Sequence, residues 1–177
     1  MPRPLPGKPA PALEARLVGG GTWRLAEQTP QNFSLVVAYR GLHCPICKIY
    51  LKDLHSRLGA FAERGVEAVA LSADSEERAA EAKQGWQLPD LALAHSLDLD
   101  TARSWGLYLS AGHGKTSAGV DEPALFTEPG VFLVRADGTL YYANTQSMPF
   151  ARPSFEDLAK AVDFALQKNY PARGEAE

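Results

Sequence analysis

The apolar and polar positions of the chain follow two periods, one typical of strands and one typical of helices. An apolar run over 33–39, rich in β-branched and aromatic residues, predicts a buried strand. Beyond it, apolar residues recur in steps of four and three: Cys47, Leu51, Leu54, Leu58 and Phe61. This spacing predicts one helix over 45–64, which Gly65 ends. The run 66–72 then predicts a second strand, parallel to the first, with a right-handed crossover between them.

Two hairpins are predicted on either side of this unit. Residues 13–25 contain two short strand-like stretches around the turn Gly19-Gly20-Gly21. Residues 129–142 contain two more, around Asp137-Gly138. Together with the strand–helix–strand unit, these hairpins predict an α/β domain.

The remaining segments predict shorter elements and one long loop. The elements are a helix to about 85 capped by Asp74 or Ser75, a short strand over 91–96, a short helix over 101–106 capped by Asp100 or Thr101, and a last helix over 155–168 capped by Ser154. Residues 110–129 are predicted to be the least structured stretch of the chain. A loop of that length in a compact domain is usually functional or mobile. We expect one domain over 1–177, with an extended N-terminus over 1–11 and a frayed tail over 170–177.

Composition and charge narrow the class of protein. With 177 residues, 45% of them hydrophobic and 22% charged, the chain can bury a sizeable core. A net charge of −3 argues against a surface for nucleic acid or for acidic membranes. No apolar run approaches the roughly 20 residues of a membrane span, and the start of the chain has no apolar stretch of the signal-peptide type. We therefore expect a cytoplasmic protein.

The candidate chemistry lies where the first strand meets the first helix. The segment His43-Cys44-Pro45-Ile46-Cys47 contains the only two cysteines of the chain, in a Cys-x-x-Cys pattern. Pro45 suits the first helical position, which places Cys44 at the N-cap. Free N–H groups and the positive end of the helix dipole stabilise a thiolate there. The pattern indicates a thiol redox site.

A structural zinc site and two inert core thiols are the competing interpretations. Zinc would need two more ligands. The four histidines, His43, His55, His95 and His113, are scattered and show no second paired spacing. Redox chemistry is therefore the favoured interpretation, without a metal or another cofactor.

The order of elements resembles the thioredoxin fold, and more closely its peroxiredoxin branch, the alkyl hydroperoxide reductase and thiol-specific antioxidant (AhpC/TSA) family. The resemblance covers nearly the whole chain, and the segment 6–13 looks like the N-terminal motif of that family. It implies a central mixed β-sheet with helices on both faces and an N-terminal β-hairpin. The Cys-x-x-Cys is similar to that of a peroxiredoxin-like subfamily intermediate between peroxiredoxins and thioredoxins.

The active-site motif of the family fits only in part. Its Pro-x-x-x-Thr-x-x-Cys falls on residues 40–47, so that Cys47 takes the peroxidatic position, Cys44 replaces the threonine and Arg40 replaces the proline. The catalytic arginine of the family would fall near Glu128-Pro129 and is absent there. Pro129 instead resembles the cis-proline that faces the Cys-x-x-Cys of thioredoxins.

Three other residues are candidates for supporting roles. His43 could stabilise the thiolate or be an exposed loop residue. Arg40 could add positive charge near the sulfurs or end a strand in solvent. The segment 146–153 could fold back over the site, with Arg152 in place of the missing arginine, although a rigid lead into the last helix is the simpler interpretation.

The resemblance implies a thiol-dependent antioxidant enzyme that reduces peroxides through a Cys44/Cys47 dithiol–disulfide cycle, with a thioredoxin-like or glutathione-type reductant. The N-cap argument makes Cys44 the nucleophile, whereas the peroxiredoxin frame favours Cys47. A thiol–disulfide oxidoreductase acting on protein disulfides and a non-enzymatic redox sensor remain alternatives. The sequence leaves the oligomeric state open, and a homodimer is compatible with it.

Overall fold

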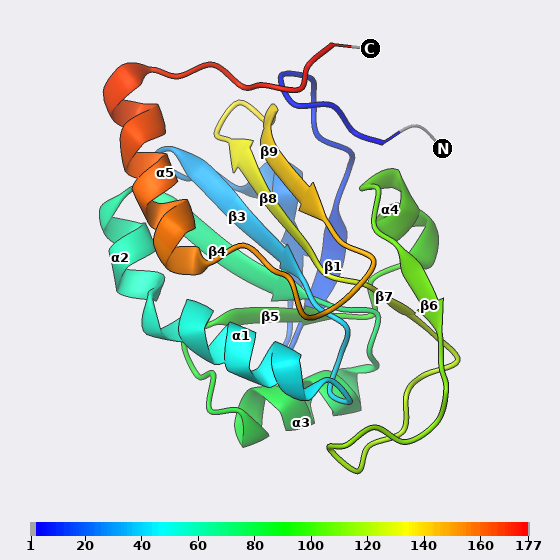
Figure 1. The fold of residues 1–177 in the computed structure, drawn as a ribbon. Coiled ribbons are helices and arrows are strands. Elements are labelled where there is room, and N and C mark those ends of the chain that lie inside the picture. The colour runs from blue at the N-terminus through cyan, green and yellow to red at the C-terminus, as the bar shows by residue number, and fades with distance from the viewer. Residues whose placement is uncertain (1–2, 177) are drawn as a thin grey trace.

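The computed structural model describes residues 3–176 and forms an α/β fold around one large sheet (Figure 1). In chain order the elements are β1 (Glu14–Leu17), β2 (Thr22–Arg24), a 3-10 helix (Leu25–Glu27), β3 (Phe33–Ala38), α1 (Pro45–Ser56), α2 (Leu58–Glu63), β4 (Val66–Leu71), α3 (Glu76–Gly85), β5 (Ala92–His95), α4 (Leu99–Ser104), β6 (Leu109–Ala111), β7 (Leu125–Thr127), β8 (Gly130–Arg135), β9 (Leu140–Thr145) and α5 (Phe155–Lys168).

The sheet has seven strands in the order β2-β1-β5-β4-β3-β8-β9. The central strand β3 pairs with β4 in parallel and with β8 antiparallel, so the sheet is mixed. The β3–α1–α2–β4 segment is the predicted crossover unit. The predicted fold class, a thioredoxin-like mixed sheet with an N-terminal hairpin, is confirmed.

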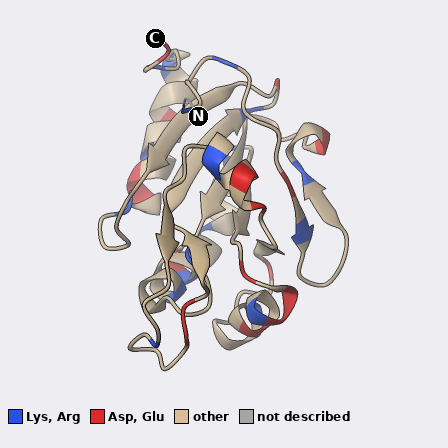
Figure 2. Ribbon diagram, turned by 90° about the vertical axis from the view of Figure 1, so that its right-hand side faces the viewer, with Lys and Arg blue, Asp and Glu red and all other residues tan. Residues whose placement is uncertain are grey.

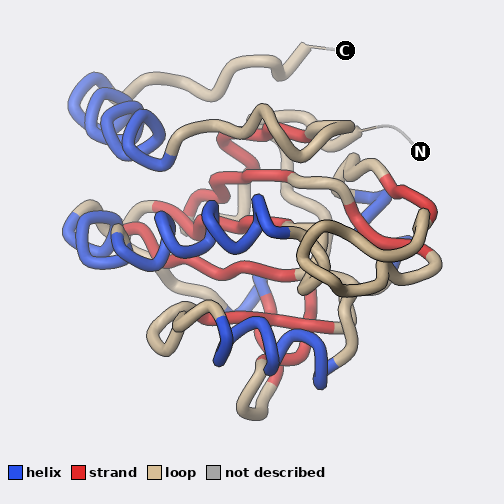
Figure 3. The backbone as a smooth tube through the Cα atoms, turned by 60° about the horizontal axis from the view of Figure 1, so that its bottom comes forward, coloured by secondary structure: helices blue, strands red, loops and turns tan. Residues whose placement is uncertain are grey.

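Helices cover both faces of the sheet (Figures 1 and 3). Side chains of β3 alternate between two buried clusters, because successive residues of a strand point to opposite faces. Leu35 and Val37 belong to the cluster formed with α1, α2, α3 and α5. Val36 and Ala38 belong to the second cluster, which contains Trp105 at the end of α4. The first cluster also contains Cys44 and Cys47, so the redox motif lies against the core.

The predicted helix over 45–64 is interrupted. α1 ends at Ser56 and α2 begins at Leu58, with Arg57 between them at φ −107 and ψ 4. Gly59 lies in the first turn of α2, and glycine weakens helix continuity. The break still lets Phe61 reach the core beside Leu54.

The N-caps of α3, α4 and α5 can be compared with the prediction. Ser75, one of the two expected caps of α3, caps that helix by accepting from the N–H of Arg78. The side chain of Ser154 accepts a hydrogen bond from the N–H of Asp157, which confirms the predicted cap of α5. For α4 the expected caps were wrong, because the helix begins at Leu99 and Asp98 caps it through the N–H of Thr101.

The predicted loop over 110–129 is more ordered than its glycine content suggests. β6 and β7 occupy its two ends and pair antiparallel outside the main sheet, with Leu109 opposite Thr127. The N-terminal extension is also held in place, since Gly7 N–H donates to Leu140 O and Leu140 N–H donates to Lys8 O. The first residue of the tail, Tyr170, accepts a hydrogen bond from the Tyr141 hydroxyl through its carbonyl O at 3.0 Å.

Basic and acidic residues are interspersed over the elements visible in Figure 2. Within residues 3–176, no helix has both the length and the apolar character needed to cross a membrane.

Candidate active site

Cys44 and Cys47 lie at the start of α1, on the side that faces the sheet. Cys44 is the N-cap residue, with extended backbone angles of φ −101 and ψ 103, and Pro45 begins the helix, as the sequence predicts. The Cys44 sulfur accepts a hydrogen bond from the backbone N–H of Cys47 at 3.2 Å. Both cysteines are free thiols, and they are only 1% and 0% exposed.

Arg152 reaches these sulfurs from the segment before α5. Its Nη2 lies 3.1 Å from Sγ of Cys47 and 3.7 Å from Sγ of Cys44. Its Nε donates to the carbonyl O of Pro149 at 2.8 Å, and its guanidinium lies over the ring of Tyr50 at 5.0 Å. The segment 146–153 is therefore not merely a lead into the last helix, because it carries a cation onto both sulfurs.

The two thiols differ in acidity. The hydrogen bond from the Cys47 thiol, the backbone N–H of Cys47 and the charges of Arg152 and Arg40 lower the pKa of Cys44 to about 6, against the opposing effect of burial. Burial, together with the hydrogen bond to Cys44, raises the pKa of the Cys47 thiol. Arg152 lies closer to Cys47, but the burial of Cys47 in the core disfavours a negative charge on that sulfur. The free N–H groups at the helix start favour the negative charge on Cys44.

Arg40 contributes less than Arg152 to this charge balance. Its Nη2 lies 3.3 Å from Glu122, its Nε lies 3.3 Å from Glu128, and its guanidinium covers the ring of Phe126 at 4.7 Å. The negative charges of these two carboxylates therefore offset part of its effect on the sulfurs. Neither sequence interpretation describes this side chain fully, since Arg40 is neither a free cation nor a solvent-exposed strand end.

His43 is buried, so the interpretation of an exposed loop residue was wrong. Its ring packs edge-on against Phe126 at 4.6 Å, and Nδ1 lies 3.4 Å from Nη2 of Arg78. Burial lowers the pKa of His43 to about 4, and the nearby Arg40 and Arg78 charges act in the same direction while Asp74 opposes them. The imidazole is neutral at neutral pH and adds no positive charge for the thiolate.

The expected cis bond before Pro129 was also wrong, since every peptide bond among the described residues is trans. The neighbouring groups explain this geometry. Glu128 N–H donates to Tyr108 O at 2.8 Å, and Pro129 O accepts from Gln146 N–H at 3.1 Å. An extended trans chain satisfies both contacts between β7 and β8.

Sequence reasoning missed two side chains that contact the turn before Cys44. Asp74 was interpreted only as a candidate helix cap, yet its Oδ2 accepts from Leu42 N–H at 2.7 Å. Thr116, within the predicted loop, donates to the carbonyl O of His43 at 2.7 Å. A polar residue three positions after the end of a parallel strand was a signal for Asp74, because residues that follow such strands meet at one edge of the sheet. No local pattern marks Thr116.

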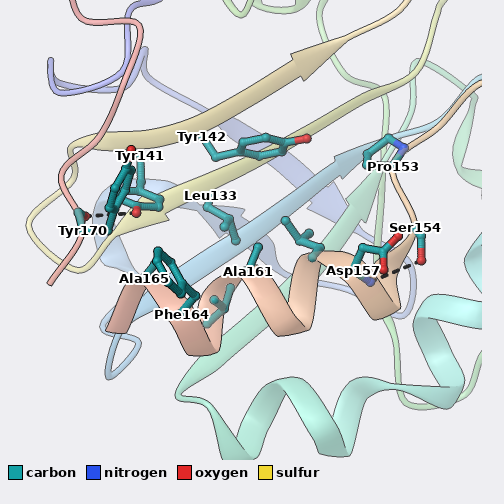
Figure 4. Close-up of a pocket in the computed structure, with 12 residues that line it drawn as sticks. Leu133, Tyr141, Tyr142, Pro153, Ser154, Asp157, Ala161, Phe164, Ala165 and Tyr170 are labelled. Carbon is teal, nitrogen blue, oxygen red and sulfur yellow. Dashed lines mark hydrogen bonds between the residues drawn. The ribbon is translucent and has the colours of Figure 1, made fainter. Parts of the chain in front are cut away.

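A separate apolar groove of about 520 Å³ lies between α5 and the β8–β9 hairpin (Figure 4). Tyr141, Tyr142 and Phe164 line it, and Pro153 lies at one end. Neither cysteine lines this groove. Within residues 3–176 no three His, Cys, Asp or Glu side chains are grouped so that they could hold a metal ion.

Comparison with solved structures shows a common fold. Peroxidoxin BcpB from Mycobacterium tuberculosis matches with a TM-score of 0.71 and 18% identity, over 93% of this chain and 99% of that one. A peroxiredoxin-like protein from Aquifex aeolicus matches with a TM-score of 0.73 and 14% identity, over 93% and 89%. Reduced 2-Cys peroxiredoxin from Plasmodium vivax matches with a TM-score of 0.74 and 18% identity, over 97% and 89%. Among curated proteins, none matches the chain significantly.

The family model provides the stronger evidence. The model of the AhpC/TSA family matches residues 6–143, which include both cysteines and all strands up to most of β9. Arg152 and α5 lie beyond the matched residues. A match over this much of the sequence places the chain in the AhpC/TSA family.

Proposed function

We propose that the protein is a thiol-dependent peroxidase that reduces peroxides through a Cys44/Cys47 dithiol–disulfide cycle. The observation that best supports this proposal is the position of Arg152. Its guanidinium contacts both sulfurs, while its buried Nη1 has no hydrogen-bond partner among the described residues. Such a group can donate to a peroxide oxygen that approaches the thiolate. Peroxide cleavage needs a donor of this kind, because negative charge builds on the leaving oxygen.

The reaction begins at the Cys44 thiolate, the more acidic of the two sulfurs. Its Sγ attacks one peroxide oxygen, so that an S–O bond forms and the O–O bond breaks. The other oxygen leaves with a proton as water or an alcohol, and Arg152 stabilises its charge during cleavage. The Cys47 thiol then attacks the sulfenic sulfur of Cys44, which releases water and forms the disulfide.

An external thiol must complete the cycle. Two thiols of a reductant, from a thioredoxin-like protein or a glutathione system, reduce the Cys44–Cys47 bridge and become a disulfide themselves. Such a cycle suits a reducing compartment such as the cytoplasm, where thiol donors are present.

Rapid oxidation kinetics of the reduced protein test this function. Hydrogen peroxide, an organic hydroperoxide and oxidised glutathione are each mixed with wild type and with Arg152→Ala. We expect Arg152→Ala to slow oxidation by both peroxides about 10²-fold, the usual loss for one transition-state donor, and to slow oxidation by the disulfide much less. Arg57→Ala is the matched control, because Arg57 pairs with Asp53 and Glu156 rather than with the sulfurs. Equal losses with peroxides and disulfide would contradict the proposal.

Disulfide exchange with proteins is a second candidate, favoured by the low pKa of an N-cap cysteine in a Cys-x-x-Cys motif. The burial of Cys44 argues against it, since a protein disulfide must approach the attacking sulfur directly, whereas a peroxide is small. Turnover of a protein disulfide at a rate above that for peroxides would make this the better assignment.

A further inference from the structure

The turn over 41–44 delivers Cys44 to the start of α1. It is closed by its own hydrogen bond, from the N–H of Cys44 to the carbonyl O of Gly41 at 3.1 Å. Gly41 has a φ of +136, which side chains other than glycine rarely adopt. The turn thus depends on an unusual backbone, and its position depends on contacts from outside.

The first external contact comes from Asp74, which follows β4. The Asp74 side chain is fully buried, and its Oδ2 accepts from the N–H of Leu42 at 2.7 Å. Its Oδ1 accepts from Nε of Arg78 at 2.9 Å, which offsets the carboxylate charge. A Cβ added at Gly41 would lie 2.7 Å from Oδ2 of Asp74, so the turn rests directly on this carboxylate.

The second contact comes from the loop between β6 and β7. Oγ1 of Thr116 donates to the carbonyl O of His43 at 2.7 Å. The same loop is attached to α3, since Nη2 of Arg78 donates to the carbonyl O of Asp121 at 3.1 Å. The two central residues of the turn, Leu42 and His43, are therefore each held by a side chain from a distant segment.

Thiolate stabilisation at Cys44 requires this placement. Its sulfur accepts from the Cys47 N–H at 3.2 Å and lies 3.7 Å from Nη2 of Arg152. Both contacts weaken steeply with misalignment. A turn that shifts by a few tenths of an ångström would lose part of each.

We propose that Asp74 and Thr116 are positioning residues for Cys44, which hold the turn so that its sulfur meets the Cys47 N–H and the Arg152 guanidinium. This inference rests on the proposed function only in taking Cys44 as the attacking thiol. Neither Asp74 nor Thr116 touches the sulfur in the contacts described above.

The test is a titration of the Cys44 thiolate by its ultraviolet absorbance in Cys47→Ser protein, which retains one thiol. Asp74→Asn is added to this background, because an amide has one acceptor oxygen and cannot serve both Leu42 and Arg78. The second variant is Thr116→Val. Asp53→Asn is the matched control, since Asp53 also accepts from the Nε of an arginine four residues later at 2.9 Å, but on the outer part of α1.

We expect Asp74→Asn to raise the pKa of Cys44 by about one unit above that of the Cys47→Ser parent, which lowers the thiolate fraction at the parent's midpoint about fivefold. Thr116→Val shifts the titration in the same direction, and Asp53→Asn does not shift it. The charged groups facing Cys44, Arg152 and Arg40, remain in every variant. A purely structural role would lower the melting temperature and leave the titration in place.

An unchanged titration in folded Asp74→Asn and Thr116→Val proteins would overturn the inference. If Asp74→Asn fails to fold, the Thr116→Val titration alone decides the outcome. The readout is the acidity of one thiol, so this test is independent of peroxide reduction. A protein that does not reduce peroxide can still show the expected shifts in the Cys44 titration, and a protein that reduces peroxide can lack them.

Discussion

Nη2 of Arg152 lies 3.1 Å from the sulfur of Cys47, although the two residues are 105 positions apart in the chain. The same nitrogen lies 3.7 Å from the sulfur of Cys44. One guanidinium therefore faces both sulfurs, so in the proposed cycle it can stabilise negative charge on either of them. We propose that Arg152, from a different segment, takes the role of the catalytic arginine that is missing near residue 128.

Cys44 should be the reactive thiol in alkylation. Cys47→Ser retains Cys44 and leaves a hydroxyl that can still donate to its sulfur, whereas Cys44→Ser retains the buried Cys47. We expect the Cys47→Ser protein to react with iodoacetamide in its thiolate form above about pH 6 and to lose reactivity as the pH falls below that value. The Cys44→Ser protein should react only at much higher pH, because burial raises the pKa of Cys47. Labelling rates measured against pH separate the two.

The reverse order would support the peroxiredoxin frame. Faster labelling of the Cys44→Ser protein in mildly acidic solution would make Cys47 the nucleophile. Denatured samples of both variants serve as controls, since both thiols then have ordinary acidity.

Arg40→Ala should affect stability more than peroxide reduction. Arg40 pairs with Glu122 and with Glu128, whose side chain is 4% exposed. Removing the cation leaves a buried carboxylate without its partner, which costs on the order of 3 kcal/mol in unfolding free energy. Urea denaturation measures this loss. Arg103→Ala is the control, because the exposed Arg103–Asp100 pair should contribute less than about 1 kcal/mol.

The same Arg40→Ala protein should be oxidised by peroxide at a rate much closer to wild type than that of Arg152→Ala. The contacts of Arg40 with two carboxylates are the reason. A loss of rate as large as that of Arg152→Ala, in protein that remains folded, would show that the Arg40 charge reaches the sulfurs.

Peroxide oxidation of the wild type should be slower than that of a two-cysteine peroxiredoxin measured side by side. A threonine hydroxyl helps orient the peroxide in the family motif, and that position holds Cys44, which as the proposed attacking thiolate has no proton to donate. One missing donor costs on the order of 10²-fold in rate. Second-order rate constants for hydrogen peroxide check this, and a rate equal to that of the peroxiredoxin would contradict it.

Local patterns were sufficient for much of the fold and for part of the site. The strand over 33–39, the helix start at Pro45 and the Ser154 cap are each encoded within a few neighbouring residues, so period and capping rules predict them. The N-cap position of Cys44 follows from the same rules. These local features suffice to place Cys44 and Cys47 after the strand over 33–39 and at the start of the helix, without knowledge of any tertiary contact.

Tertiary contacts decided what the sequence could not. The path of residues 146–153 brings Arg152 to the sulfurs, and no local period indicates that path. His43 is buried by Phe126 and Arg78, which come from other segments. Pro129 is trans because its neighbours join the hydrogen bonding of Tyr108 and Gln146.

The neutral His43 should make the fold sensitive to acid. Its pKa is about 4 in the folded protein, below the unperturbed value of about 6.5 in the unfolded chain. Between these values the unfolded state binds more protons, so the unfolding free energy decreases as the pH falls. The contribution of His43 is fully present above about pH 6.5 and is lost progressively toward about pH 4, by roughly 2 to 3 kcal/mol.

His43→Gln isolates this contribution, because glutamine does not titrate. Urea denaturation at a series of pH values should give a variant whose unfolding free energy falls less between about pH 6.5 and about pH 4 than that of wild type. His113→Gln is the control for the loss of a histidine at an exposed position, on the loop before β7. If the slope of His43→Gln equals that of wild type, other groups account for the acid sensitivity. His43 would then bind protons equally in the folded and unfolded states, which would contradict a pKa lowered by burial.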